Sequence, residues 1–582
     1  MNIFNPYSDS RFLGYVSLVA PQTTNVHFPS SLLLKKFFCE DQAFHALPGR
    51  YVVIEGTDSG FLGKITEIAL PEKERLQFTE TRYEKEEFHP VGKIEILLCF
   101  DSYYLKAKKG IAQLPPVGAK VFLCANDFLG MLLTDFGKCE EREQLIPLAT
   151  LTSDTTHQVN LSGQALFSRH CAIVGTTGGG KSWTIAKLIE DVCKLGGKAV
   201  VIDPTGEYQA LQNKDVWYRK FSGGNDKGTF LNFKNLRDTD LYALFRPSQQ
   251  SQLPKLQEAM KSLRLIERLS SKKLSEGESE FMFWSNYVMK NKEHDYSYIK
   301  KGSDADSIKF IEACKNNPEV YSQCCRFDIN ALASQVLKEC VDGSGAVDKQ
   351  ATNNCQSLIT RILLTINDKS FDEVFNFKGK QEALGSEDFS ALFAKFITSQ
   401  ASVLIISVAE VSTDNKLREI LINAIGRFLL EKALNREFKG EIQKPKKSLL
   451  LFLDEAHLFL NKKIKDEYSI EVDLNSFERI AKECRKFGLF LVLSTQMPRD
   501  IPRGVLSQMG CFIVHRLINQ FDREAIEYAC SEASKSALSF LPILSSGEAM
   551  ITGVDFPMPM ILKIKPPLVP PDSGTPMVFS TD

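Results

Sequence analysis

Continuous apolar runs separated by helical patterns make up much of the chain after residue 165. These runs occupy residues 171–174, 402–407, 448–453 and 488–493, and their apolar residues are consecutive rather than alternating. This pattern is typical of parallel strands that are buried on both faces of a sheet. Residues 183–192 and 417–434 follow two of the runs and have helical spacing. The pattern predicts an α/β core built on a parallel sheet.

Residues 1–155 show a different pattern, with short runs rich in β-branched and aromatic residues. The runs lie at 11–20, 49–56, 61–70 and 93–100, and turn signals such as those at 57–60 and 115–118 separate them. Several short strands at this spacing predict a small N-terminal β-barrel domain.

Residues 246–395 interrupt the α/β pattern with helical periodicity at 255–269, 306–314 and 355–367. In the first of these segments an apolar stripe of Leu256, Met260, Leu263 and Ile266 follows three- and four-residue steps. Such a stripe is far more typical of a helical core than of a ligand site. We therefore expect an inserted helical bundle that divides the core into residues 156–245 and 396–555.

The run at 171–174 leads into a glycine-rich segment with the G-x-x-x-x-G-K-[ST] spacing of a phosphate-binding loop. Glycines allow successive backbone N–H groups to face phosphate oxygens, and the dipole of the next helix points at the same anion. Lys181 is expected to reach the β- and γ-phosphates, and Ser182 to bind Mg²⁺. The predicted nucleotide-binding residues are Gly175, Thr176, Thr177, Gly178, Gly179, Gly180, Lys181, Ser182 and Thr184.

Two carboxylates, Asp454 and Glu455, follow the apolar run at 448–453. We expect Asp454 at the C-terminal edge of its strand, in range of the Mg²⁺ shell, and Glu455 in a position to polarise the attacking water. Two solvated carboxylates after a core strand are the simpler alternative, which the phosphate loop disfavours. The strand predicted at 402–407 fits an extra strand between the phosphate-loop strand and this one, as in NTPases that use a catalytic glutamate.

The run at 488–493 ends in Ser494-Thr-Gln496, at the edge where open α/β sheets bind ligands. The Gln496 amide is expected to sense the γ-phosphate or the attacking water. The helical pattern at 477–487 carries several cations, which form either a solvated helix face or, in a ring, the source of an arginine finger. The finger candidates are Arg485, then Arg479, with Arg516 as the next choice.

Together these motifs resemble the HerA ATPases, which belong to the HerA/FtsK group of hexameric DNA-pumping motors. The resemblance covers roughly residues 10–35 and 165–570. It rests on the phosphate loop, Asp203-Pro-Thr-Gly-Glu207-Tyr208, Leu453-Asp-Glu-Ala-His457 and Arg485-Lys-Phe-Gly488 with Ser494-Thr-Gln496. Gly179 stands where the family usually shows Ser, and Ser494-Thr stands where Val-Ser or Ile-Ser is commoner. Neither departure removes a group that the chemistry needs.

The resemblance implies a RecA-like P-loop core with an additional strand and a catalytic glutamate, crowned by the N-terminal barrel. It implies ATP and Mg²⁺ as cofactors, and it adds Glu207 to the catalytic residues. The Pro-rich residues 556–582 favour extended structure. We expect residues 556–567 to brace a neighbouring subunit, and the last ten residues to be either part of that brace or a disordered end.

Two functional classes follow from the resemblance. The first is a homohexameric motor that holds double-stranded DNA in its channel, translocates it and works with a nuclease or another effector. The second is an assembly or regulatory ATPase that scaffolds a sirtuin-like NADase or a nuclease in anti-phage defence, with the effector docked on the barrel. The chain has no recognisable nuclease or NADase motif of its own, so a partner would supply that activity.

Composition narrows these possibilities. A chain of 582 residues suggests two to four domains, and 71 Lys and Arg against 72 Asp and Glu leave no bulk basic field. DNA contact therefore needs a local surface, for which Lys462, Lys463 and Lys465 are candidates and Lys227 is a weaker one. The alternative is an ordinary solvated loop.

The cysteines and the apolar runs bear on the compartment. The 14 cysteines form no C-x-x-C pair, which argues against zinc and a disulfide framework. No 18-residue apolar run and no signal peptide are present, so we expect a cytoplasmic protein without a membrane partner.

Overall fold

The computed structural model describes residues 5–21, 23–29, 47–71, 88–104, 107–108, 113–135, 144–152, 154–221, 228–272, 279–291, 295–342, 344–438, 448–460, 462–464, 470–530, 535–556 and 558–574. The chain divides into two compact units. Unit 1 comprises Met1–Gly196 and Phe490–Ser573, and unit 2 comprises Gly197–Leu489 and Gly574–Asp582.

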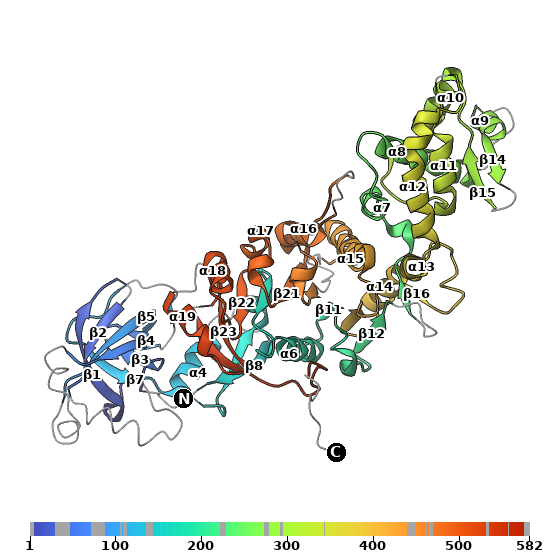
Figure 1. The fold of residues 1–582 in the computed structure, drawn as a ribbon. Helices are drawn as coiled ribbons and strands as arrows, with labels where there is room; N and C mark the ends of the chain where they lie inside the picture. Colours follow the sequence, from blue (N-terminus) through green and yellow to red (C-terminus); the bar gives the residue numbers. More distant parts are fainter. Residues whose placement is uncertain are drawn as a thin grey trace, which may run out of the picture. The chain divides into compact units, whose positions relative to one another are not determined.

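Unit 1 begins with a closed antiparallel barrel (Figure 1). Its strand order is β2-β1-β7-β3-β4-β5, and pairing of β2 with β5 closes the ring. Leu13, Val26, Val52 and Ile94 are fully buried in its core. The predicted barrel is confirmed, although the sequence pattern missed the short strands β2 and β7. The strands are β1 (Phe12–Val19), β2 (Thr23–His27), β3 (Tyr51–Ile54), β4 (Ser59–Ala69), β5 (Val91–Asp101) and β7 (Lys120–Leu123).

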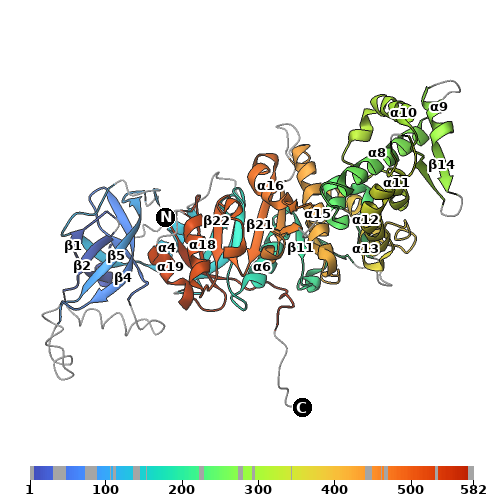
Figure 2. The ribbon, with the colours of Figure 1, turned by 45° about the horizontal axis from the view of Figure 1, so that its top comes forward.

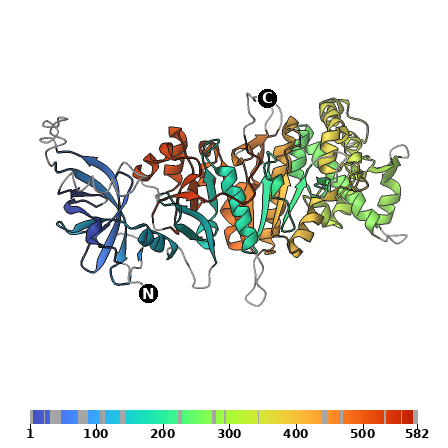
Figure 3. The same cartoon turned by 90° about the horizontal axis from the view of Figure 1, so that it is seen from below.

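The barrel is followed by α4 (Asn126–Asp135) and by the α/β part of unit 1. Here β10 (Cys171–Val174) lies between β21 (Leu489–Thr495) and β22 (Cys511–Val514), parallel to both. Antiparallel strands continue the sheet in the order β23 (Glu548–Gly553), β24 (Met560–Ile564), β8 (Leu145–Leu151) and β9 (Gln158–Ser162). Helix α6 (Lys181–Lys194) runs alongside these strands, and it is the teal helix near the centre of Figure 3.

Two segments of unit 1 differ from the sequence-based expectation. Strand β8 pairs with β9 and β24, so the chain has left the barrel before the predicted boundary at residue 155. Strand β24, within the stretch predicted to brace a neighbour, instead pairs with β23 and β8 of its own sheet. Alternating burial along β24 explains this placement, because its apolar side chains complete the core of the same subunit. Just beyond β24, Lys565 N donates to Leu148 O and Leu568 N donates to Glu190 Oε2, so the start of the tail also bonds within its own unit.

Unit 2 holds four parallel strands in the order β12-β17-β11-β18. They are β11 (Lys198–Asp203), β12 (Val216–Lys220), β17 (Val403–Ser407) and β18 (Leu449–Leu453). The predicted extra strand, β17, therefore lies between β11 and β12. Strand β11 separates β17 from β18, so β17 does not lie between β10 and β18 as the sequence predicts. Strands β11, β17 and β18 are all continuous apolar runs, and such runs do not show which strand lies beside which. The sequence could therefore not place β17 correctly.

The predicted helical insert is confirmed in unit 2 (Figure 2). Helices α8 (Gln252–Ser271), α11 (Leu332–Lys338) and α12 (Lys349–Asn367) pack on one another. Leu256, Met260 and Leu263 of α8 are buried, as the stripe predicts. The other elements of the insert include α9 (Ser279–Tyr287), α10 (Asp304–Lys315) and the hairpin of β14 (Val288–Asn291) and β15 (Tyr296–Ile299).

Candidate nucleotide site

The phosphate loop joins β10 to α6 and has the backbone that its glycines permit. Gly178 has φ 72° and Gly180, the N-cap of α6, has φ 115°. Side chains are disfavoured in this region of φ, so glycine is needed at both positions. Ser182, Thr176 and Thr177 remain at least partly exposed, and α6 presents its free N–H groups at the same place. The segment is therefore shaped to bind an anion.

Two side-chain hydrogen bonds involve the residues of the loop. Thr177 Oγ1 donates a hydrogen bond of 2.5 Å to Gln496 Oε1, which lies just beyond β21. The pairing of Val174 with Thr495 in adjacent strands produces this contact. Lys181 is buried, and its Nζ donates to Thr176 O at 3.4 Å. Gln496 thus lies at the loop, where the sequence places it.

A histidine missed by the sequence reasoning supports the loop from behind. His515 is fully buried at the end of β22, and a Cβ added at Gly175 would lie 2.6 Å from its Cβ. Its Nε2 lies 2.8 Å from Thr184 Oγ1, and its Nδ1 lies 2.9 Å from Glu548 O. Burial, with a smaller effect of Lys181, lowers the pKa of His515 to about 4. The ring is therefore neutral, donating to Glu548 O and accepting from Thr184.

The carboxylates of unit 2 surround Tyr208. Asp454 follows β18 and is buried, and its Oδ2 accepts a 2.8 Å hydrogen bond from the Tyr208 hydroxyl. Asp203 ends the adjacent strand β11, and its Oδ1 accepts from Gly206 N at 2.8 Å. Burial raises the pKa of Asp203 to about 6, and the charge of Asp454 adds to this effect. Tyr208 therefore holds the Asp454 carboxylate in one orientation.

Glu455 has a backbone conformation that is rare for a residue with a side chain. Its φ is 44°, and its Oε2 lies 3.3 Å from His457 Nδ1. Strain of this kind concentrates at functional sites. Glu207 is half-buried, and its charge contributes to raising the pKa of Tyr208, after burial and the effect of Asp454. Glu207 and Glu455 thus belong to the acidic surroundings of unit 2.

The described residues contain no cluster of three or more His, Cys, Asp or Glu side chains arranged for a metal ion. This finding is compatible with Mg²⁺, which usually takes one or two carboxylates and completes its shell with water and substrate phosphates. Asp454 and Ser182 are the predicted ligands, and both stay predictions.

The arginines proposed as fingers differ in their surroundings. Arg479 on α16 (Ser476–Glu483) donates from Nε to Glu483 Oε1 at 3.1 Å. Arg485 begins a short 3-10 turn after α16 and is exposed. Arg516 is exposed as well, while its carbonyl accepts from Thr176 N at 3.0 Å. All three arginines are therefore exposed, and exposure does not separate the candidates.

The lysines proposed for DNA contact lie in and around a small hairpin. Lys462 and Lys463 belong to β19 (Lys462–Ile464), which pairs with β20 (Val472–Leu474). Lys463 Nζ lies 2.5 Å from Glu471 and 3.5 Å from Asp473. The bond to Glu471 and the charge of Asp473 raise the pKa of Lys463. Lys465 and Lys227 lie outside the described residues.

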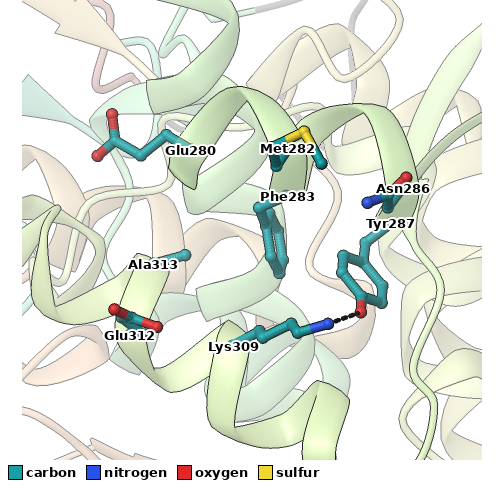
Figure 4. Close-up of a pocket in the computed structure, with 8 residues that line it drawn as sticks. All are labelled: Glu280, Met282, Phe283, Asn286, Tyr287, Lys309, Glu312 and Ala313. Carbon is teal, nitrogen blue, oxygen red and sulfur yellow. Dashed lines mark hydrogen bonds between the residues drawn. The ribbon is translucent and has the colours of Figure 1, made fainter. Parts of the chain in front are cut away.

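One hollow in the insert does not involve any motif residue. It has a volume of about 290 Å³ between α9 and α10 (Figure 4). Lys309 donates to the Tyr287 hydroxyl at 3.3 Å across it, and Phe283, Glu280 and Glu312 line its walls. Its mixed lining shows no phosphate-binding geometry.

Comparison with known proteins agrees with the geometry. The family model "Helicase HerA, central domain" matches residues 146–429, and "Helicase HerA-like C-terminal" matches residues 431–571. The chain is 25% identical over 566 residues to the probable DNA double-strand break repair helicase HerA of Methanocaldococcus jannaschii, covering 94% of this chain and 95% of that protein. It is 24% identical over 533 residues to the DNA double-strand break repair helicase HerA of Sulfurisphaera tokodaii, covering 89% of this chain and 88% of the relative.

Among solved structures, VirB4 of Thermoanaerobacter pseudethanolicus superposes with a TM-score of 0.43 at 12% identity, covering 73% of this chain and 97% of that one.

Within the described residues, no helix is both long and apolar enough to span a membrane. The two HerA models lie end to end and include the phosphate loop, Asp454, Glu455 and Gln496. The chain belongs to the HerA family of P-loop ATPases.

Proposed function

We propose that this chain hydrolyses ATP and uses the energy to translocate double-stranded DNA as a homohexameric ring, together with an effector subunit. The glycine loop with Lys181 at the start of α6 carries the ATPase part of this proposal, because it fits the phosphates of a nucleoside triphosphate. The names of the HerA relatives, which are DNA repair helicases, support DNA as the partner. The cytoplasmic location stays a prediction.

Nucleotide binding falls to the phosphate loop. Its N–H groups, with those at the start of α6, would bind the phosphates of ATP. Lys181, now bonded to Thr176 O, would exchange that neutral acceptor for the charged β- and γ-phosphates. Ser182 and Asp454 would bind Mg²⁺, which neutralises phosphate charge when present. The residues therefore suit Mg²⁺ and ATP as ligands.

Hydrolysis needs a base for the attacking water, and Glu455 would supply it. Asp454 is held by Tyr208, so its orientation is fixed before nucleotide binds. The Gln496 amide, bonded to Thr177 on the loop, would report whether the γ-phosphate is present. We propose that these groups act on the same nucleotide, with Glu207 contributing negative charge nearby.

A second function is supported by the hairpin of β19 and β20. Lys463 is paired with Glu471 and Asp473, so part of the proposed DNA surface is neutralised within the chain. This favours an assembly or regulatory ATPase, in which the ring scaffolds a nuclease or NADase effector on the barrel and hydrolysis gates its activity. Both functions use the same nucleotide site.

An ATPase assay with and without duplex DNA separates the two functions. Stimulation by duplex is expected for the motor, and unchanged turnover for the scaffold. Lys181→Ala should abolish turnover, and Glu455→Gln should keep ATP binding while lowering turnover by at least ~10²-fold, the lower range for a general base. Glu267→Gln, an exposed carboxylate on α8 of the insert, serves as the matched control. Normal turnover of Glu455→Gln would contradict the assignment of the base.

A further inference from the structure

The turn at residues 545–548 touches the phosphate loop of unit 1 at several points. Ser546 Oγ donates to Gly178 O at 3.2 Å, and Gly547 N donates to Gly179 O at 3.3 Å. Glu548 O accepts from His515, the residue packed behind the loop. The turn itself is tied by Ser545 N, which donates to Glu548 Oε2 at 2.8 Å. These contacts fix the carbonyl groups of Gly178 and Gly179.

The same segment reaches the barrel a few residues earlier. Lys64 of β4 is 7% exposed, and its Nζ lies 3.9 Å from the centre of the Phe540 ring. The Tyr51 ring of β3 also lies near this ammonium, with its centre 5.8 Å from Nζ. Burial lowers the pKa of Lys64 to about 8, with Glu95 opposing the shift. A buried ammonium held by ring faces responds strongly to any change in ring position.

A cavity of about 240 Å³ lies beside this contact, and it is lined from both sides. Lys64 and Tyr51 contribute from the barrel, and Phe540, Leu544 and Glu548 from the segment that leads to the loop. Close-packed cores resist small shifts, whereas a cavity gives the Phe540 ring room to move. The cavity therefore lies between the contact of Lys64 with Phe540 and the turn at 545–548 that bonds to the phosphate loop.

We propose that residues 540–548 are a relay through which the barrel controls the phosphate loop, with Lys64 on Phe540 as the input and Ser546, Gly547 and His515 as the output. A partner protein that docks on the barrel and shifts β4 changes the position of Phe540. This change moves the turn at 545–548, and the turn moves the carbonyl groups of Gly178 and Gly179 because it is hydrogen-bonded to them. This inference rests on the proposed function, because it names the regulation of the same nucleotide site.

Nucleotide affinity, measured with a fluorescent ATP analogue on the full chain, tests the relay. Lys64→Met keeps the aliphatic stem and removes the charge, and Phe540→Leu removes the ring. Each should weaken binding by about threefold to tenfold, the size expected for one cation–π contact. Lys64→Arg should restore wild-type affinity. Lys120→Met, on an exposed residue of β7, is the matched control and should bind like the wild type.

Coupling distinguishes a relay from simple loss of stability. Ser546→Ala removes one output contact, and the double variant Lys64→Met/Ser546→Ala should bind no more weakly than the weaker single variant. Additive losses, or wild-type affinity of both Lys64→Met and Phe540→Leu, would overturn the relay while leaving the ATPase proposal intact. A wild-type chain that fails to bind the analogue would overturn both. Equal thermal unfolding temperatures of wild type and Lys64→Met support the relay, and a large drop in Lys64→Met overturns it.

Discussion

Tyr208 is the residue on which the acidic groups of unit 2 converge. Its hydroxyl donates to Asp454, and its backbone N–H donates to Asp203 Oδ2 at 3.3 Å. In the sequence these residues belong to two motifs about 250 residues apart, and neither motif indicates that they are in contact. The adjacent, parallel strands β11 and β18 bring their ends together. Tyr208 therefore acts as a positioning residue for Asp454.

Tyr208→Phe tests this role. The change removes one hydrogen bond to a carboxylate and keeps the ring, so turnover should fall about tenfold while ATP affinity stays near the wild-type value. The dependence of turnover on Mg²⁺ concentration should shift to higher concentration, because Asp454 is less well oriented. Tyr218→Phe, on strand β12 of the same unit, is the control. An unchanged Mg²⁺ dependence would contradict the positioning role.

Asp203 makes the stability of the fold depend on pH. Its pKa is raised from 3.8 to about 6 in the folded chain, chiefly by burial. The folded state therefore binds the proton more tightly than the unfolded state, and this contribution to stability is full below pH 4 and lost as pH rises through about 6. In Asp203→Asn, the denaturation midpoint should therefore depend less on pH over this window. The same slope in both proteins would contradict the assignment.

At the scale of elements, the glycine loop, α6 and β18 follow directly from local patterns, whereas the hairpin of β19 and β20 does not. The lysines read as a basic segment in the sequence. In the fold Lys463 lies opposite Asp473 and close to Glu471, so two carboxylates offset its charge. The pairing of distant residues changes the charge that the hairpin presents.

This pairing gives a test of DNA contact. If the hairpin faces DNA, Glu471→Gln combined with Asp473→Asn should raise duplex affinity and steepen its salt dependence, because Lys463 is released from its partners. Replacing Lys462, Lys463 and Lys465 by Ala should do the opposite, equally for all sequences, and leave DNA-free ATPase nearly unchanged. Fluorescence anisotropy across a salt series measures both. An unchanged salt slope in both variants would place the DNA contact elsewhere.

For the whole molecule, the proposed ring predicts that an arginine of one subunit acts on the nucleotide of its neighbour. Arg479 and Arg485 are both exposed, Arg479 on α16 and Arg485 in the 3-10 turn that follows it. If Arg485 acts on a neighbour's nucleotide, a mixture of Arg485→Ala and Lys181→Ala subunits should regain part of the ATPase activity that each lacks alone. In such a mixture, some interfaces between subunits have an intact Arg485 from one subunit and an intact Lys181 from its neighbour. Full activity of Arg485→Ala alone would exclude it and leave Arg516 as the next candidate.

The sequence by itself determined the features that depend on local spacing. The phosphate loop, the carboxylates after a buried strand, Gln496 and the amphipathic helices of the insert are each encoded within a few consecutive residues. Tertiary structure decided what depends on pairing between distant segments. It placed β17 between β11 and β12, and it drew β24 into its own sheet. It also brought His515 behind the loop, more than 300 residues from Thr184. Strand order, burial and long-range hydrogen bonds are properties of the packed chain, so no local pattern specifies them.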